Sequence, residues 1–573
     1  MRIIAIDTET VSLDDKTLLA YSICIQGNTP IVEPVKMNTV VNAAKEEHIE
    51  YITRFIEDKK NRIVFHNSSF DIPVLVKFGV PFKIFEQASK EGRIEDTVIM
   101  ANMVDENIRH GLKYLTKRYF KHEMTKYKEV CGTGKKQISF ADVDWRIAQD
   151  YAGEDAYWTW KLYNYLSRQL QKDISSFNLY EAVEKPLLLV VADMHINGIT
   201  VDVKKVKEIG ELCQRKIKSL EEKLDITMGD VNFNSPKQLR EYFVNKKNLP
   251  VLKTTRTGEP SVDKEVLKKY AESDGDAEML LEYRKYAKIY STFIPALTPD
   301  EWDIDTWRGK IYASFNQAGT SSGRFSSSSP NMQNIPNEDK LGIRDCIIAD
   351  KDHVLIGADY SQVELRILAH CSQDFNLMKA YQDELDIHQL TADACGVERR
   401  PAKTINFGLV YGMGAKTLSK RIGVTYDDAE QYIERYFDKY PGIKDFWNDI
   451  EEQIKTQGYI KTEFGRTRRR TIYFLAKDEY DQSREIRSIT NAVIQGTAAD
   501  MMKIAMKNMY PQLKAIGARI VSTVHDEVIV SAPKDKAKRA YAIVHRAMVL
   551  AGETLSVPIT VDAKIGQTWN EVH

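Results

Sequence analysis

The sequence predicts a chain of several domains that combine the α/β and α+β classes. Strand-like and helix-like segments alternate over the first part, to about residue 175, which is the α/β pattern. The next part, from about 180 to 300, is mainly helical and rich in Lys and Glu. Further on, an apolar strand at 354–358 and strands around 518–532 and 558–565 enclose helical segments from about 373 to 510. At 573 residues the chain is also too long for a single core.

The composition is that of an ordinary globular protein and does not decide the function. The formal net charge of −1 neither supports nor excludes a nucleic-acid partner, because basic residues can cluster while the total cancels. None of the six cysteines forms a CxxC pair, so neither a zinc ribbon nor a disulfide framework is indicated, and a reducing cytoplasm fits. The start, MRIIAIDTET, lacks a signal-peptide pattern, and no apolar run reaches about 18 residues, so we expect no membrane span.

Two neighbouring acids interrupt an apolar strand near the C-terminal end. In VSTVHDEVIVSA, residues 521–532, β-branched residues surround Asp526 and Glu527. The acids are either turn residues at a hairpin tip or metal ligands that the strands present. Asp359, which closes the apolar strand 354–358, is the candidate partner, although alone it would pass for a turn acid or a helix cap.

A second set of acids lies in the first part of the chain. Asp7 and Glu9 follow the apolar strand 3–6, and alternate residues of a strand face the same side, so the two carboxylates repel unless a cation lies between them. A solvated strand end is the alternative. Asp71 ends the segment HNSSFD, and in YAGED, which we expect to lead a helix, the four-residue spacing places Tyr151 and Asp155 on one face.

These three segments resemble the 3′–5′ proofreading exonuclease domain of DNA polymerases, where DxE, NxxxD and YxxxD occur in this order. The resemblance implies an RNase H-like exonuclease domain over residues 1–175. Its four acids, Asp7, Glu9, Asp71 and Asp155, would hold two Mg²⁺ or Mn²⁺ ions. Tyr151 would orient the attacking water, and Asn67 would position the single-stranded 3′ end.

A stripe of four residues marks the helix-like segment RRPAKTINFGLVYG, residues 399–412. Arg399, Lys403, Phe407 and Tyr411 are spaced by four, so they lie along one helix face. Two cations followed by two aromatic rings fit neither a core face nor a solvated face. A nucleoside triphosphate, phosphorylated at one end and planar at the other, has the matching shape.

A second polar row, Arg487, Asn491 and Gln495, has the same four-residue spacing. It is either a solvated stripe or a row of donors for the DNA minor groove, where acceptors recur at every base pair. The basic run RTRRR at 466–470 is expected to contact phosphate or solvent, with no catalytic role.

Together these motifs resemble family A DNA polymerases, the bacterial polymerase I type, of bacterial or bacteriophage origin. RRxxKxxxFxxxYG matches the fingers helix, DYSQVELR and VHDE match two palm motifs, and FNSPKQL and GTSSGRFSSSSPNMQNIP resemble thumb and thumb–palm segments. The resemblance implies a right-hand polymerase over residues 176–573. Its expected parts are a thumb at about 200–310, a palm at about 311–372 and 491–573, and fingers at about 373–490.

The resemblance also implies a role for each matching residue. Asp359 and Asp526 would hold two metal ions, with Glu527 as an auxiliary acid. Contacts to the incoming dNTP are expected from Arg399, Lys403, Phe407, Tyr411, Glu364 and Gln362. Contacts to DNA are expected from Arg324, Arg487, Asn491, Gln495 and His525.

Three of these roles are more specific. Lys403 is also a candidate proton donor to the leaving pyrophosphate. Glu364 would crowd the 2′ position of the sugar and so reject ribonucleotides. Phe407 would pack against the sugar and make the enzyme discriminate against dideoxynucleotides.

The predicted function is template-directed DNA synthesis from dNTPs with 3′–5′ proofreading, in replication or repair, in the cytoplasm of a bacterium or an infected host. The expected partners are primer-template DNA, dNTPs and a single-stranded 3′ end; no accessory protein is identifiable. A single-subunit RNA polymerase is an alternative that Glu364 and the exonuclease acids oppose. An inactive DNA-binding protein is another, which the intact acids oppose. Because Met1 directly precedes the first strand, we expect no 5′-nuclease domain.

Overall fold

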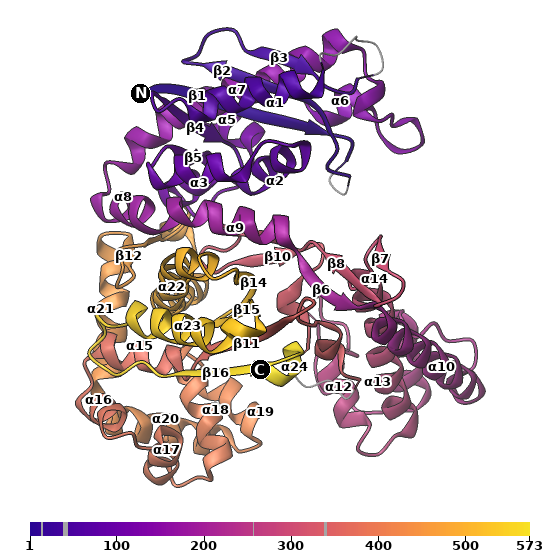
Figure 1. Ribbon diagram of the computed structural model, residues 1–573. Helices are drawn as coiled ribbons and strands as arrows, with labels where there is room; N and C mark the ends of the chain where they lie inside the picture. The colour runs from indigo at the N-terminus through magenta and orange to yellow at the C-terminus, as the bar shows by residue number, and fades with distance from the viewer. Residues whose placement is uncertain (13–14, 38–43, 256, 337–340) are drawn as a thin grey trace.

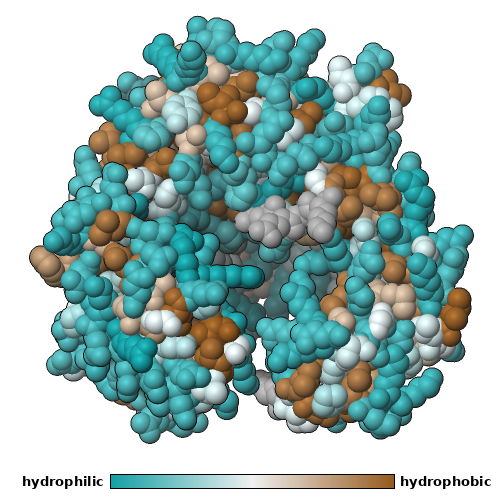
Figure 2. Space-filling view, turned by 90° about the horizontal axis from the view of Figure 1, so that it is seen from below, coloured by the Kyte–Doolittle hydropathy of each residue, from teal (hydrophilic) through white to brown (hydrophobic). Residues whose placement is uncertain are grey.

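A computed structural model describes residues 1–12, 15–37, 44–255, 257–336 and 341–573. Figure 1 shows an N-terminal α/β unit at the top, with helix α9 (Lys185–Asn197) running beneath it. Below α9, a small sheet lies between two helical lobes. Seen from below, Figure 2 shows that the molecule is hollowed between the two lobes, with hydrophilic residues along the hollow.

The N-terminal unit is built on a mixed five-stranded sheet in the order β3-β2-β1-β4-β5. Strand β1 pairs antiparallel with β2 and parallel with β4, and its side chains Ile4, Ala5 and Ile6 are fully buried. The strands are β1 (Arg2–Thr10), β2 (Leu18–Ile25), β3 (Ile31–Pro34), β4 (Asn61–Phe65) and β5 (Ile94–Asp96). The helices are α1 (Lys45–Glu57), α2 (Ser68–Phe78), α3 (Phe82–Lys90), α4 (Thr97–Val104), α5 (Leu112–Phe120), α6 (Tyr127–Cys131), α7 (Trp145–Leu170) and α8 (Ile174–Leu179).

Two local predictions for this unit need correction. Asp7 and Glu9 lie within β1 rather than after it, because pairing with β2 continues to Thr10. YAGED does not lead its helix, because α7 begins at Trp145, where the carboxylate of Asp144 caps it by accepting a hydrogen bond from the backbone N–H of Arg146.

The part from 180 to 300 is mainly helical, as predicted. Its helices after α9 are α10 (Val203–Met228), α11 (Pro236–Arg240), α12 (Lys264–Tyr270), α13 (Gly275–Lys288) and α14 (Ile294–Ala296). A strand that the sequence did not suggest, β6 (Ile199–Asp202), pairs with β8 (Arg308–Ile311), which also pairs with β7 (Trp302–Asp303). The right-hand lobe in Figure 1 contains α10, α12 and α13.

The central sheet is antiparallel, in the order β14-β15-β11-β16. Its strands are β11 (His353–Tyr360), β14 (Arg519–Val524), β15 (Glu527–Pro533) and β16 (Val561–Gly566). The long helix α22 (Glu479–Lys514) and α23 (Ala537–Ala551) pack against it, and α24 (Trp569–Val572) closes the described chain beside β11. The predicted strands around 518–532 and 558–565 are confirmed.

The left-hand lobe joins β11 to α22 and is mostly helical, as predicted. It contains α15 (Val363–Ser372), α16 (Phe375–Gln382), α17 (Ile387–Cys395), α18 (Arg399–Val410), α19 (Ala415–Ile422), α20 (Tyr426–Lys439) and α21 (Pro441–Thr456). A hairpin of β12 (Tyr459–Lys461) and β13 (Thr467–Arg469) was not predicted. The Ser-, Pro- and Asn-rich segment 321–337, whose composition is typical of a loop, contains β10 (Ser326–Ser328), paired with β9 (Ser314–Asn316), in its described part.

Two arginines of the basic run at 466–470, Arg466 and Arg468, are buried rather than in contact with solvent, whereas Arg469 and Arg470 are half-buried. Arg466 is buried and ion-paired, through Nη2, with Glu184 and, at 2.6 Å, with Asp500. Arg468 and Arg469 both pair with Glu106 of the N-terminal unit at 2.9 Å. The expectation of contact with solvent is wrong for Arg466 and Arg468, because acids distant in the sequence surround the hairpin and neutralise it.

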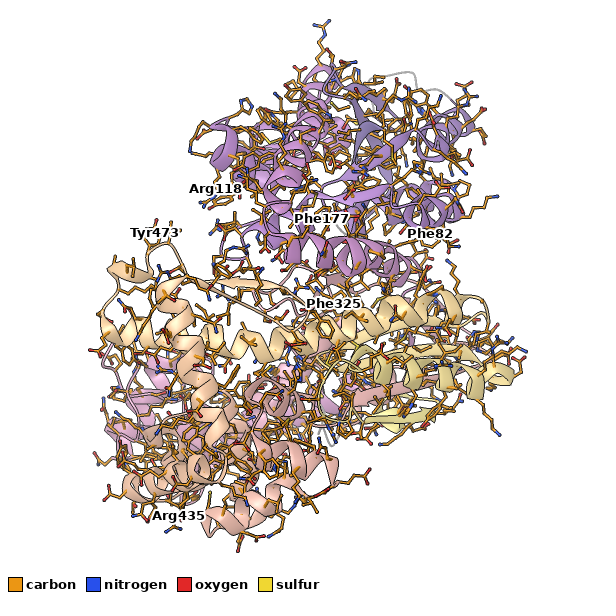
Figure 3. All side chains as sticks on the ribbon, turned by 90° about the vertical axis from the view of Figure 1, so that its left-hand side faces the viewer. Phe82, Arg118, Phe177, Phe325, Arg435 and Tyr473 are labelled. Carbon is orange, nitrogen blue, oxygen red and sulfur yellow. The ribbon has the colours of Figure 1, made fainter. Side chains whose placement is uncertain are left out.

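Lysines of α22 complete this junction between the N-terminal unit and the rest of the chain. Figure 3 places Phe82 and Phe325 along it, one on each side. Nζ of Lys514 lies 4.3 Å from the centre of the Phe82 ring, and Nζ of Lys503 lies 5.5 Å from that of Phe325. Lys503 is buried and also pairs with Glu184 at 2.7 Å.

Within the described residues, every helix is either too short or too polar to cross a membrane.

Candidate active sites

The first site is a cluster of carboxylates between β1 and α7. Asp7 and Glu9 of β1 and Asp155 of α7 each offer an oxygen, and these oxygens all lie within 4.8 Å of one another. Alternation along β1 places Asp7 and Glu9 on one side, as predicted, and the packing of α7 on β1 brings Asp155 to them. One oxygen of Asp155, Oδ1, is buried and has no hydrogen-bond partner among the described residues, which leaves it free to ligate.

Asp71 lies beside this cluster on α2, where Thr8 of β1 holds it. Oδ1 of Asp71 accepts hydrogen bonds from the Thr8 backbone N–H at 3.1 Å and from the Thr8 hydroxyl at 2.7 Å. Asn67 is exposed at the N-terminus of α2 in a left-handed conformation. The side chain of Asp96 fixes this turn by accepting from the backbone N–H groups of Asn67 and Ser68.

The acids repel one another and are poorly hydrated. Burial, followed by the charges of Asp155, Asp71 and Glu9, raises the pKa of Asp7 well above its usual range. Burial likewise raises the pKa of Glu9 well above its usual range, that of Asp71 to about 8 and that of Asp155 to about 7. A divalent cation bound to these acids would offset both the cost of burying their charges and their mutual repulsion. Hard carboxylate oxygens are the donors that Mg²⁺ and Mn²⁺ prefer. The donor set therefore fits a metal.

Tyr151 borders the cluster from α7. Burial, and then the charges of Asp155, Glu9 and Asp7, raise the pKa of its hydroxyl, so the phenol stays protonated. Its oxygen accepts a hydrogen bond at 2.9 Å from Nζ of Lys113, a residue that sequence reasoning did not single out. A contact between side chains 38 positions apart, on two different helices, has no signature in a short motif.

The second site lies at one end of the central sheet. In the β11 register, Asp359 stands opposite Glu527 of β15 and opposite Asp562 of β16. Asp526 occupies the turn between β14 and β15, and its carbonyl accepts from the Tyr360 N–H at 3.3 Å. Asp526 and Glu527 thus form the tip and first strand residue of a hairpin, as predicted. Asp562, an acid the sequence analysis missed, faces the same position.

The electrostatics of these acids follow the same pattern as in the first site. Burial, and then the charges of Asp526 and Glu527, raise the pKa of Asp359 to about 7. Burial also raises the pKa of Asp526. Residues near the C-terminal end hold Glu527. Both of its carboxylate oxygens accept from the indole N–H of Trp569 at 3.2 Å, and Nδ1 of His573 lies 3.3 Å from Oε1. These contacts fix the orientation of Glu527, which stays close enough to Asp359 for its charge to raise the pKa of that acid.

Glu364 brings together two other predicted site residues. Its carboxylate accepts hydrogen bonds from Nη2 of Arg324 at 2.5 Å and from the hydroxyl of Tyr411. Nδ2 of Asn491 donates to the carbonyl of Tyr411 at 3.4 Å, whereas Oδ1 of Asn491 is buried and finds no partner in the part of the chain that the structure describes. Gln362, which directly precedes α15, accepts a hydrogen bond from the hydroxyl of Tyr381 at 3.1 Å.

The predicted stripe on α18 is accessible along its whole length. Arg399 and Lys403 are exposed and Phe407 is half-buried, while Ala402 and Ile405 between them are buried. Tyr411 lies one residue beyond the end of the helix. Three residues of the stripe also contact neighbouring side chains. Arg399 pairs with Asp386 at 2.7 Å, the ring of His388 lies 5.7 Å from that of Phe407, and Gln495 bonds the Tyr411 hydroxyl.

The remaining predicted DNA contacts lie on α22 and in the hairpin turn. Arg487, Asn491 and Gln495 are half-buried, whereas their neighbours Ile489 and Val493 are buried, so the row forms one accessible face of α22. His525 is exposed in the turn with a φ of 56°. Partial desolvation of its ring and the nearby charge of Arg324 lower its pKa.

One end of the central sheet carries paired acids beside the accessible helix α18 with its cations and aromatic rings, and a separate acid cluster lies between β1 and α7. The sequence matches the family model "DNA polymerase family A" over residues 203–571 and the model "3'-5' exonuclease" over residues 1–171. The chain belongs to DNA polymerase family A and carries an N-terminal 3′–5′ exonuclease domain.

Its curated relatives are bacterial DNA polymerases I. The Pseudomonas aeruginosa enzyme is 34% identical over 596 residues, covering 100% of this chain and 64% of the relative. The Chloroflexus aurantiacus enzyme is 35% identical over 590 residues, covering 99% of this chain and 61% of the relative. The chain therefore spans less than two thirds of the length of these relatives.

A solved structure, the POL domain of Pol1 from M. smegmatis in complex with DNA primer-template and dNTP, has the same fold. The TM-score is 0.83 at 25% sequence identity, and the match covers 99% of this chain and 96% of that one.

Proposed function

We propose that this protein synthesises DNA from dNTPs on a primed template and removes nucleotides from the primer 3′ end at a second site. The observation that carries the proposal is the meeting of Asp359 and Asp526 at one end of the central sheet. The accessible stripe of α18 and the bound primer-template and dNTP of the Pol1 structure support it. We divide the chain into an exonuclease domain, 1–175, and a polymerase domain, 176–573.

The acids of both sites have the donor chemistry for divalent ions. Asp359 and Asp526 would hold two Mg²⁺ or Mn²⁺ ions at the polymerase site, and Asp7, Glu9, Asp71 and Asp155 would do so at the exonuclease site. When bound, such ions neutralise the developing charge on the phosphoryl oxygens and activate the attacking oxygen. Glu527, whose carboxylate is held by Trp569, would be an auxiliary acid beside Asp359, its register partner across β11 and β15.

The residues of the α18 stripe then bind the incoming nucleotide. Arg399 and Lys403 contact the phosphates, since both are charged donors on the exposed end of the stripe. Phe407 packs against the sugar and Tyr411 borders the templating base. Glu364 limits the space at the 2′ position, while it also fixes Tyr411 through their hydrogen bond.

Primer-template DNA would lie in the hollow between the two lobes seen in Figure 2. Arg324, Arg487, Asn491 and Gln495 would donate to minor-groove acceptors, which are present at every base pair, so the row would test pair geometry without reading sequence. His525 would contact the primer end. At the exonuclease site, Asn67 would hold the single strand and Tyr151 would orient the attacking water.

Primer extension with dNTPs or NTPs, with and without Mg²⁺, tests the polymerase assignment. We expect extension with dNTPs and Mg²⁺ only, and none from Asp526→Ala. Extension that survives Asp526→Ala would contradict the assignment. Trimming of a labelled single strand tests the exonuclease assignment separately, since Asp7→Ala should abolish trimming and leave extension intact.

A further inference from the structure

We propose that Lys113 is a positioning residue of the exonuclease site, which holds the Tyr151 hydroxyl in place through a charged hydrogen bond. The inference rests on the proposed exonuclease function and extends it by one residue. Lys113 lies in the first turn of α5, outside the three exonuclease motifs of the sequence.

The geometry fixes the lysine on both sides of its ammonium group. Nζ donates to the hydroxyl oxygen of Tyr151 at 2.9 Å and to the carbonyl oxygen of Thr125 at 2.5 Å. It also lies 4.1 Å from the centre of the Tyr151 ring. The base of the side chain is held by α5, whose neighbouring residues Leu112 and Leu115 are buried. Lys113 therefore reaches Tyr151 from a rigid support.

The segment that carries Thr125 in turn contacts α7, the helix that carries Asp155. The carboxylate of Glu154 accepts from the backbone N–H of Thr125 at 2.9 Å and lies 2.7 Å from Nε2 of His122. Glu154 immediately precedes Asp155 on α7. A closed set of contacts thus links Lys113, Thr125 and α7, so the ammonium group keeps a constant position relative to the acids.

This bond determines what the phenol can do. An ammonium group has only donors, so Nζ uses a lone pair of the Tyr151 oxygen and leaves the phenolic hydrogen free to donate. That hydrogen can therefore be directed at a water or at a phosphate oxygen held by the acids. A hydrogen bond from a positively charged donor to this oxygen also makes the O–H a stronger donor. Without Lys113 the phenol could rotate or turn its hydrogen to a carboxylate.

The charge of Lys113 has a second consequence. It is the cation that opposes the mutual repulsion of Asp7, Glu9 and Asp155, since it lowers the pKa of each of them against the effect of burial. No ion pair within bonding distance joins Lys113 to these acids in the described part of the chain, so their oxygens stay open to metal. The lysine balances charge without occupying a ligand position.

The test is a double-mutant cycle on the single-turnover rate of trimming of a 5′-labelled single strand, with enzyme in excess and Mg²⁺ saturating. We expect Lys113→Met to lower this rate roughly 10- to 100-fold, as misplacement of a reacting group does. In a Tyr151→Phe background the same substitution should cost less than about threefold, because the hydroxyl it holds is absent. Lys113→Arg, which keeps a charged donor, should recover most of the rate.

The matched control is Lys117→Met. Lys117 lies one turn further along α5 and pairs with the exposed Glu123, and the described contacts link it to neither Tyr151 nor the acids. It should trim within about twofold of the wild-type rate. Thermal unfolding of each variant checks that it is folded, and Lys113→Gln replaces Lys113→Met if the latter is not.

Two results would overturn the proposal. One is trimming by Lys113→Met at the wild-type rate. The other is an equal loss in the wild-type and Tyr151→Phe backgrounds, which would mean that Lys113 acts through its charge or through the Thr125 segment and not through the Tyr151 hydroxyl. If the wild-type protein does not trim at all, the exonuclease function itself fails, which is a distinguishable outcome.

Discussion

The backbone N–H of Phe315 donates a hydrogen bond to Nε2 of His195 at 2.7 Å, and Nδ1 of the same ring lies 2.8 Å from the carbonyl oxygen of Ser69. Because an amide N–H only donates and a carbonyl only accepts, the ring is neutral with its proton on Nδ1. Ser69 belongs to α2 of the exonuclease domain and Phe315 to β9. A neutral imidazole on α9 therefore joins the two parts of the chain.

This bridge predicts a loss of stability in mild acid. Burial lowers the pKa of His195 from 6.5 to about 4, so below about pH 6.5 the unfolded chain binds a proton that the folded chain does not. The contribution of His195 is complete above pH 6.5 and declines as the pH falls towards 4. Denaturant unfolding at pH 7.5 and 5.0 measures the free energy of unfolding of each protein. Between these pH values it should fall by about 2 kcal/mol less for His195→Gln than for the wild type.

An equal loss of stability in the two proteins would contradict this account of His195. His66, whose pKa burial lowers to about 3, remains in both proteins and cancels in the comparison.

The buried Arg466 predicts a large effect on stability. Arg466→Met would leave Asp500 and Glu184 in the core with Lys503 as their one remaining cation among the described contacts. Breaking a buried ion pair by removing one partner costs about 3–5 kcal/mol. Lys455→Met, which removes an exposed pair with Glu451, should cost less than about 1 kcal/mol. Similar unfolding free energies for the two variants would refute the buried cluster.

The acid cluster predicts that one catalytic carboxylate destabilises the metal-free protein. The pKa of Asp7 is raised in the folded state, so its contribution to stability is present at low pH and is lost as the pH rises past its unfolded value. In EDTA at pH 8, Asp7→Asn should therefore be more stable than the wild type, by on the order of 1 kcal/mol. Added Mg²⁺ should raise the melting temperature of the wild type more than that of the variant.

The control for the metal experiment is Asp150→Asn. Asp150 is exposed on α7, one turn before Glu154. The melting temperature of Asp150→Asn should rise with Mg²⁺ as much as that of the wild type. If the melting temperature of Asp7→Asn also rises as much, Asp7 is not a ligand.

Phe407 predicts discrimination between deoxy- and dideoxynucleotides. Its half-buried ring lies on the α18 stripe between Lys403 and Tyr411 and offers no polar atom. Phe407→Tyr adds a hydroxyl that can replace the hydrogen bond of a missing 3′-OH, so the ratio of dideoxy to deoxy incorporation should rise about tenfold or more. Competition in single-nucleotide extension measures the ratio. Phe375→Tyr, at an exposed position on α16, should leave it unchanged, and an unchanged ratio in Phe407→Tyr would refute the role.

Local periodicity was sufficient to predict much of both sites. Alternation along a strand placed Asp7 and Glu9 on one side, and the four-residue spacing placed Tyr151 and Asp155 on one helix face. Acids at the ends of apolar strands made Asp359 and Asp526 candidate partners, and the family resemblance supported the pairing, since the two residues come from distant strands. The roles assigned to these residues remain predictions.

What the sequence did not reveal depends on contacts between distant segments. Asp562 faces Asp359 because β16 pairs with β11, and Lys113 meets Tyr151 because α5 packs on α7. The basic run at 466–470 looked solvated because its acids, Glu106, Glu184 and Asp500, lie elsewhere in the chain. Burial of charge is a tertiary property and leaves no local pattern.

The central claim is that two separate acid sites act on one primer end. The direct measurement follows a 5′-labelled primer with a single 3′-terminal mismatch, annealed to its template, with Mg²⁺ and dNTPs. The wild type should shorten the primer and then extend it to full length. Asp526→Ala should only shorten it, and Asp7→Ala should not shorten it at all. Shortening by Asp7→Ala, or extension by Asp526→Ala, would contradict the account.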